Sequence, residues 1–180
     1  MSSEKALRGK MLKLWGSEGI VTVSESPIAP LLPSQISNFV SDVGIPKAVP
    51  AYDFNLLDPK SWKIVTLGGA NREAGLKDVW PISQHESADV ATGVDLATGQ
   101  VFDLDLRGEQ PPAFVNSSLP CFVEFVTLVE ERRLAVEPDE IGLTDVDQRL
   151  REELEALDPK AFADEGTVWS MYFEEIEYGL

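Results

Sequence analysis

Residues 114–134 read FVNSSLPCFVEFVTLVEERRL, and this stretch decides how the rest of the chain must pack. Five of its apolar residues recur at helical spacing, and two more widen the stripe: the five are Leu119, Phe122, Val123, Val126 and Val129, and the two are Phe125 and Leu128. The polar run NSS at 116–118 can accept hydrogen bonds from the free N–H groups of a first turn, and Arg132 and Arg133 suit the end of the helix dipole. So wide an apolar surface must be covered on several sides. We therefore predict that this stretch is the central core helix.

The composition predicts one domain with a strongly acidic surface. At 180 residues and 43% hydrophobic, the chain can bury one sizeable core. Its formal charge is −16; residues 1–14 carry four bases and one acid, whereas residues 130–180 carry 16 acids and five bases. Phosphate binding needs clustered lysine and arginine, so nucleic acid is not an expected partner. The charge fits a basic protein partner, or serves only to keep the chain soluble.

Cys121 is the only cysteine and His85 the only histidine. A single cysteine allows no internal disulfide and fits a reducing compartment. The N-terminus lacks the apolar run of a signal peptide, and no apolar stretch approaches the roughly 18 residues that span a membrane. We therefore expect a soluble, cytoplasmic protein without a membrane partner.

The sequence of the N-terminal part predicts two helices joined by an extended arm. Residues 4–15 have the pattern of a short amphipathic helix, and the arm follows it to residue 29. Gly19 lies in a loop that we expect to tolerate larger residues. Ser34 is placed to cap the second helix, which Gly44 should end.

The sequence of the C-terminal part predicts two more amphipathic helices. Residues 145–157 place four apolar residues on one side. Residues 169–178 (WSMYFEEIEY) should bury their aromatic residues and expose Glu174, Glu175 and Glu177.

The clearest strand signal is a hairpin formed by residues 90–96 and 101–106. Its linker has Gly99 where a positive φ is needed. The second strand alternates strictly, so Asp103 and Asp105 share one face and the apolar residues between them share the other. We expect a sheet with one face packed on helices and one partly wet. A further strand is predicted at WKIVTL, residues 62–67.

Residue chemistry alone predicts no active site. Cys121 lies among apolar neighbours, which favours an inert buried thiol, and His85 has no second histidine with which to share a metal. Asp103 and Asp105 are spaced to hold a divalent cation or to act as paired acids, but two solvated side chains on an outward sheet face are the favoured explanation. We expect no catalytic residue, metal or cofactor; an enzyme or metal protein centred on Asp103, Asp105 and His85 is one rival hypothesis.

The order of signals resembles the SUKH superfamily, and in particular its fourth subgroup. The resemblance rests on LPSQISNFVSDVGIP after a proline-rich lead-in, VDLATGQVFDLD, FVNSSLPCFVEF and the terminal WSMYFEEIEYGL, and it covers residues 31–180. It implies a single α+β domain over residues 30–180, with a twisted, mainly antiparallel sheet packed against several helices. Residues 1–29 then form a separate N-terminal helix and arm.

Such a resemblance also implies a bacterial immunity protein that binds and neutralises a cognate polymorphic toxin without catalysis. Many such toxins are nucleases, which tend to be basic, and the acidic chain would complement them. A scaffold or regulatory binding module of the same fold is the other rival, and the sequence predicts no oligomeric state. We expect the partner to contact carboxylates beside exposed aromatics, at Asp103, Asp105, Glu174, Glu175, Glu177 and Tyr178.

Overall fold

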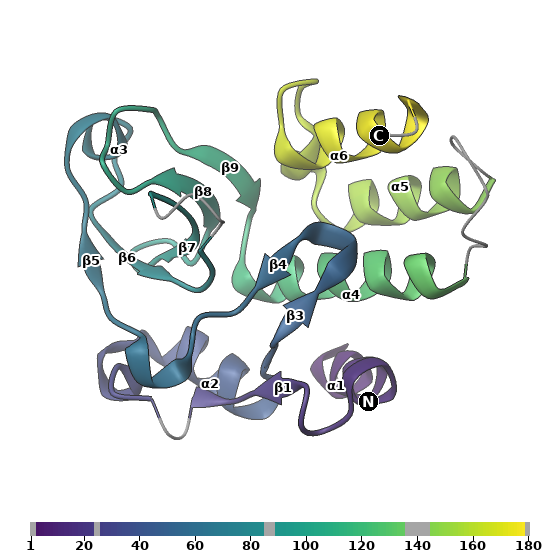
Figure 1. Ribbon diagram of the computed structural model, residues 1–180, viewed down its shortest axis with the longest axis horizontal. Helices are drawn as coiled ribbons and strands as arrows, with labels where there is room; N and C mark the ends of the chain where they lie inside the picture. The colour runs from purple at the N-terminus through teal and green to yellow at the C-terminus, as the bar shows by residue number, and fades with distance from the viewer. Residues whose placement is uncertain (1–2, 24–25, 85–88, 136–144, 179–180) are drawn as a thin grey trace.

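Helix α4 (Leu119–Ala135) lies at the centre of the molecule, as predicted. The computed structural model describes residues 3–23, 26–84, 89–135 and 145–178 (Figure 1). Helix α4 contacts α1 (Ser3–Trp15), α5 (Asp145–Leu157) and strands β3 (Ala48–Val49) and β9 (Ala113–Asn116). All seven residues of its predicted apolar stripe are buried. Within the described residues, no helix is both long and apolar enough to cross a bilayer.

The main sheet has five strands and is antiparallel throughout, which confirms a single α+β domain. Its order follows the chain: β5 (Val65–Thr66), β6 (Asp78–Pro81), β7 (Val90–Asp95), β8 (Val101–Asp105) and β9. The predicted hairpin is β7–β8, and its register pairs Val94 with Val101 and Thr92 with Asp103. The Asp95 carboxylate accepts hydrogen bonds from the N–H groups of Ala97 and Thr98, which fixes the turn.

Both faces of this sheet carry buried apolar side chains, but the face of the smaller cluster is only partly covered, because Val65, Phe102 and Leu106 on it are half-buried. One face, with Trp80, Val94 and Val101, joins the main core beneath the helices. The other carries a smaller cluster of Leu67, Leu76, Val79 and Leu104, beside helix α3 (Gly69–Glu73). The alternation in β8 was read correctly, but the residues that cover its second face come from the segment 65–79, where the sequence signals were weak.

The N-terminal region packs on the same core. Leu7 and Met11 of α1 are buried in it. The predicted arm contains strand β1 (Ile20–Val21), which pairs with β2 (Ile45–Pro46), and the arm leads into the 3-10 helix η2 (Ala29–Leu31). Strand β3 pairs with β4 (Phe54–Asn55) in a second two-stranded sheet, closed by the 3-10 helix η3 (Pro50–Tyr52).

Two local assignments differ from the prediction. Helix α2 (Ser34–Asp42) begins at Ser34, and its N-cap is Pro33, so the Ser34 side chain does not cap it; Gly44, at φ +86°, follows its end as expected. Of the strand predicted at 62–67, only β5 forms. Residues 59–61 are the 3-10 helix η4 (Pro59–Ser61), and the Trp62 indole N–H donates to the Leu57 carbonyl at 2.9 Å, which fixes Trp62 in the core instead.

The C-terminal helices stack on α4 as successive layers (Figure 1). Helix α5 packs on α4, and the 3-10 helix η5 (Pro159–Phe162) leads to α6 (Val168–Tyr178), which contacts β9. The bounds of α5 and α6 agree with the predicted helices to within one residue.

Gly99→Val is expected to destabilise the protein by roughly 1–2 kcal/mol, because Gly99 adopts φ +79°, where a Cβ is penalised. The matched control is Gly68→Val. Gly68 has an extended backbone, and a Cβ added there would have no heavy atom within 4 Å, so valine should fit without strain. Gly19 is not the permissive position that we expected, because its Cβ would lie 2.6 Å from the Trp15 Cβ. Thermal melts of the two variants test the turn; equal losses would contradict it.

Candidate interaction surface

Helix α6 presents two contrasting faces. Trp169 and Phe173 are buried in the main core, whereas the predicted contact residues Glu174, Glu175, Glu177 and Tyr178 are all exposed. Tyr178 is 69% exposed, which is unusual for an aromatic side chain in a folded domain. The amphipathic pattern of the sequence therefore gave the correct orientation of this helix.

An aromatic cluster holds the inner face of α6 in place. The Trp169 ring stacks on Tyr52 with centroids 4.7 Å apart and meets Phe125 edge-on at 5.1 Å. Tyr172 packs against Trp169 at 5.6 Å. Burial raises the pKa of Tyr172 to about 12, so its hydroxyl remains neutral at physiological pH. These ring contacts fix the position of α6 relative to α4 and η3.

A buried polar network ties α6 to the start of α4. The Asp158 carboxylate accepts from Asn116 Nδ2 at 3.2 Å, from the Ser117 N–H at 2.7 Å and from Ser117 Oγ at 2.8 Å. Asn116 Oδ1 in turn accepts from the Trp169 indole N–H at 3.0 Å. Asn116 and Asp158 are 0% and 3% exposed. The network therefore connects β9, η5 and α6 through satisfied buried groups, which favours one fixed arrangement.

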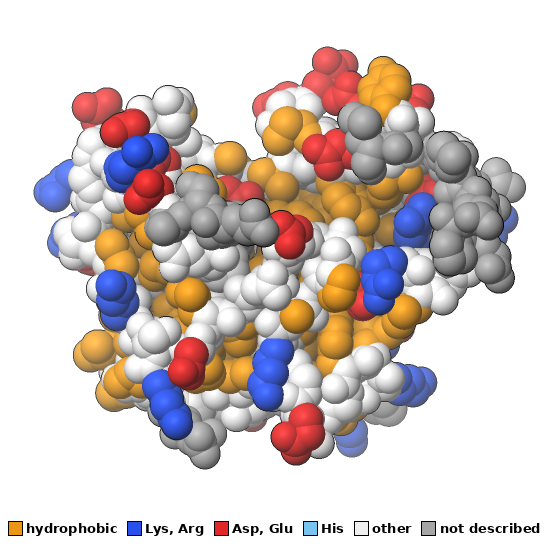
Figure 2. All heavy atoms as spheres, viewed as in Figure 1, with side chains coloured by type: hydrophobic (Ala, Val, Ile, Leu, Met, Phe, Trp, Pro, Cys, Tyr) orange, Lys and Arg blue, Asp and Glu red, His pale blue; other side chains and the backbone are white. Residues whose placement is uncertain are grey.

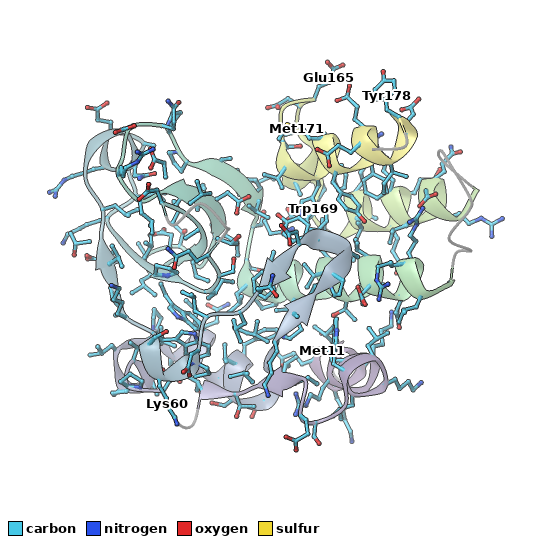
Figure 3. All side chains as sticks on the ribbon, viewed as in Figure 1. Met11, Lys60, Glu165, Trp169, Met171 and Tyr178 are labelled. Carbon is cyan, nitrogen blue, oxygen red and sulfur yellow. The ribbon has the colours of Figure 1, made fainter. Side chains whose placement is uncertain are left out.

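The outer stripe of α6 combines apolar and acidic side chains. Met171, Glu174, Glu175 and Tyr178 follow the spacing i, i+3, i+4, i+7, so they share one side of the helix. Met171 is 44% exposed and lies at one end of the stripe, with Tyr178 at the other (Figure 3). We call these four residues together with Glu177 the α6 surface. Two exposed apolar groups with acids between them form a pattern suited to protein contact.

A groove runs along one side of this surface. It has a volume of about 280 Å³ and is lined by Arg151, Glu165, Ser170, Glu174, Glu177 and Tyr178. Among these lining residues Arg151 is the one base, and its Nε lies 3.2 Å from Glu155 Oε1 on the same helix. Acidic side chains gather at this end of the molecule in Figure 2. The groove is thus acidic on balance and open to a cationic side chain.

Asp103 and Asp105 lie on β8, apart from the α6 surface (Figure 1). Asp103 is half-buried and accepts from Thr92 Oγ1 at 2.7 Å. Burial raises the pKa of Tyr52 well above its usual value, and the Asp103 charge adds to this effect. Asp103 therefore has a hydrogen-bonded position on β8 and is not part of the α6 surface.

The Asp105 carboxylate organises the loop after β8. It accepts hydrogen bonds from the N–H groups of Arg107, Glu109 and Gln110, at 2.9–3.1 Å. Desolvation opposes ionisation of the carboxyl, but these N–H groups and the Arg107 guanidinium outweigh it and lower the pKa of Asp105. Its side chain is only 9% exposed. The Asp105 side chain therefore stabilises the turn after β8 by accepting its N–H groups. The alternation of residues along the strand does not predict this role.

The groups considered for catalysis do not form a site among the described residues. Cys121 is half-buried in the first turn of α4, where its N–H donates to Ser118 Oγ at 3.2 Å, and burial raises the pKa of its thiol. A raised pKa disfavours the nucleophilic thiolate. His85 lies outside the described residues. No three His, Cys, Asp or Glu side chains of the described ranges gather as a metal site.

Sequence reasoning did not identify Met171 or Glu165 as surface residues of interest. The spacing of Met171 with Tyr178 was a usable signal, because both fall on the stripe opposite Trp169 and Phe173. Glu165 lines the groove only because the turn between η5 and α6 brings it there, and no local pattern predicts that.

A sequence model of the SUKH-4 immunity protein family matches residues 6–175. The match includes most of α1. The motifs on which the sequence resemblance rests begin only at residue 31, so they do not include this helix. No curated protein and no solved structure matches the chain.

Proposed function

Because the chain belongs to the SUKH-4 immunity protein family, we propose that it neutralises a cognate toxin by binding it through the α6 surface. The bound protein blocks access to the toxin and performs no chemistry of its own. The observation that carries this proposal, beyond the family, is the exposed stripe of Met171, Glu174, Glu175 and Tyr178 on a rigidly held helix.

The stripe has the composition of a binding hot spot. Tyr178 and Met171 supply apolar area that is desolvated on contact, and an aromatic side chain loses little conformational freedom when it binds. Glu174, Glu175 and Glu177 surround them with negative charge. Because the ring contacts and the Asp158 network already order α6, little ordering remains to oppose association.

The charge of the surface favours a basic partner. A toxin domain with lysine or arginine around its active site would place a cation in the acidic groove and gain electrostatic steering. Nuclease toxins have such a charge because their substrate is a polyanion. We therefore propose a basic, nuclease-type toxin as the partner.

The direct test begins with the genes beside this one: a toxin domain that they encode is expressed in cells with and without this protein, and survival of the cells is compared. The purified toxin is then titrated with the immunity protein while the activity of the toxin is measured. Occlusion predicts that inhibition is complete only at equimolar protein and that activity returns when the complex is dissociated in high salt.

Two results would contradict the proposal in different ways. Lasting inactivation by a small fraction of one equivalent would reveal an enzyme that modifies the toxin. A folded protein that neither protects cells nor binds the neighbouring toxin would favour the scaffold or regulatory module instead.

A further inference from the structure

The groove beside α6 is lined by a second stripe of that helix. Ser170, Glu174 and Glu177 follow the spacing i, i+4, i+7, so they lie on one side of α6 along about two helical turns. Tyr178 lies at the C-terminal end of this row. Glu165, from the turn before α6, also lines the groove, and Glu165 and Tyr178 both project outward at this end of the molecule (Figure 3).

The three acids of the groove have no partner within the described part of the chain. Glu165, Glu174 and Glu177 are exposed, and their carboxylates form no hydrogen bond or ion pair with any described residue. An ionised carboxylate only accepts hydrogen bonds. A ligand that fits this groove must therefore bring hydrogen-bond donors and positive charge.

Ser170 adds a buried acceptor to the same wall. Its side chain lines the groove, although the residue is only 9% exposed. Thr167 Oγ1 lies 3.0 Å from the Asp164 carbonyl oxygen and 2.9 Å from Ser170 Oγ. A carbonyl oxygen only accepts and a hydroxyl has a single proton, so Thr167 donates to Asp164 and Ser170 donates to Thr167. The lone pairs of Ser170 Oγ are then left to accept from a ligand in the groove.

Arg151, the one base of the lining, is engaged by other groups. Its Nε lies 3.2 Å from Glu155 Oε1, and its guanidinium carbon lies 6.0 Å from the centre of the Phe162 ring. A carboxylate and an aromatic ring thus already hold one guanidinium beside the groove. Tyr178, which is 69% exposed, and the acids of α6 offer the same two kinds of group to a second guanidinium.

We infer that this groove binds an arginine side chain of the toxin, in preference to a lysine. The guanidinium N–H groups donate to the carboxylates of Glu174 and Glu177 and to Ser170 Oγ, and the guanidinium plane stacks on the Tyr178 ring. The inference rests on the proposed function for the source of the arginine. The preference of the groove itself is measurable without any toxin.

The choice of arginine follows from how the acceptors are arranged. A guanidinium has five N–H donors in a planar fork, is weakly hydrated and stacks on aromatic rings. An ammonium has three donors at one point and is strongly hydrated. Because the acceptors of the groove are spread along α6 beside an aromatic side chain, the planar fork reaches more of them.

The test is an NMR titration of the ¹⁵N-labelled full chain with two acetylated and amidated tripeptides, Gly-Arg-Gly and Gly-Lys-Gly. We expect the arginine peptide to shift the amides of residues 165 and 170–178, and to bind about fivefold more tightly than the lysine peptide. Tyr178→Leu should remove most of this difference, because the stacking that favours a guanidinium is lost.

Two further variants test the charges of the groove. Glu174→Gln/Glu177→Gln should weaken binding of the arginine peptide about tenfold, whereas the matched control Glu152→Gln/Glu153→Gln removes two exposed acids of α5 outside the groove and should bind like the parent. Arg151→Gln should tighten binding about threefold, because it removes a like charge from the lining.

Several results would overturn the inference. They are equal affinities for the two peptides, shifts confined to other elements, no shifts at all, or an unchanged affinity in the folded Glu174→Gln/Glu177→Gln variant. If any of these occurred while the protein still neutralised the toxin through the α6 surface, the arginine site would fail and the proposed function would stand. If the arginine peptide bound as expected but the toxin did not bind, the preference of the groove would stand and the toxin would not be its source.

Discussion

Phe122→Ala is expected to destabilise the protein by about 3–5 kcal/mol, through lost burial and the cavity that it leaves. Phe122 is 0% exposed on α4 and meets the rings of Phe54 and Tyr52 edge-on, at 5.5 and 6.0 Å. It therefore joins the central helix to the β3–β4 sheet and to the base of the cluster under α6. Denaturant melts of variant and parent give the difference in unfolding free energy.

Leu134→Ala is the matched control for this change. Leu134 lies on the same helix but is 59% exposed, so its truncation should cost under about 0.5 kcal/mol. A loss of less than 1 kcal/mol at Phe122 would mean that α4 is not the organising element of the core.

Asp158→Ala is expected to have an effect of similar size, about 3–5 kcal/mol. Asn116 Nδ2, the Ser117 N–H and the Ser117 hydroxyl would each lose the same acceptor in a buried site. Asn116 also accepts from Trp169, so the loss reaches α6. We expect native-state hydrogen exchange to show the largest loss of protection in α6 and at the start of α4.

Asp158→Asn and Glu153→Ala make the test specific. Asparagine keeps the shape but only one oxygen acceptor, so it should fall between parent and alanine. Glu153 is an exposed acid on α5, and its truncation should change stability by under about 0.5 kcal/mol. If Asp158→Ala lowered the free energy of unfolding no more than Glu153→Ala, the Asp158 network would not be what holds α6 in place.

The same network shows why part of the fold could not be predicted from the sequence. Asn116 looked like a helix cap, because asparagine followed by two serines is a cap signal. It is instead the last residue of β9, and its side chain bonds to residues 42 and 53 positions away in the chain. Ser118, two residues later, is the actual cap. Local patterns locate the helix, but they do not show which polar residue the tertiary structure has already engaged.

The candidate surface was predictable to a similar degree. Helical periodicity placed Glu174, Glu175, Glu177 and Tyr178 in solvent, because a helix that buries Trp169 and Phe173 must expose the opposite side. The groove beside them was not predictable, since it depends on how α5 and the turn before α6 meet. The contact role of Asp103 and Asp105 remains a prediction, although the hydrogen bonds of both carboxylates already give them structural roles.

The central claim is that the α6 surface, and not the overall charge, recognises the toxin. The triple variant Glu174→Lys/Glu175→Lys/Glu177→Lys reverses three exposed acids of this surface. The matched control, Glu18→Lys/Asp42→Lys/Glu73→Lys, reverses three exposed acids on other elements and changes the net charge equally. Neither set is buried, so both variants should fold.

The most direct measurement is stopped-flow association of each protein with an inactive form of the neighbouring toxin domain, across a salt series. We predict that the association rate of the parent falls steeply as the salt concentration rises. At low salt the α6 variant should associate at least about tenfold more slowly than the parent, and the control variant should associate at a rate close to that of the parent. Dissociation should change less than association. Equal slowing of both variants would assign the effect to net charge, and a flat salt dependence with the α6 variant binding like the parent would place the interface elsewhere.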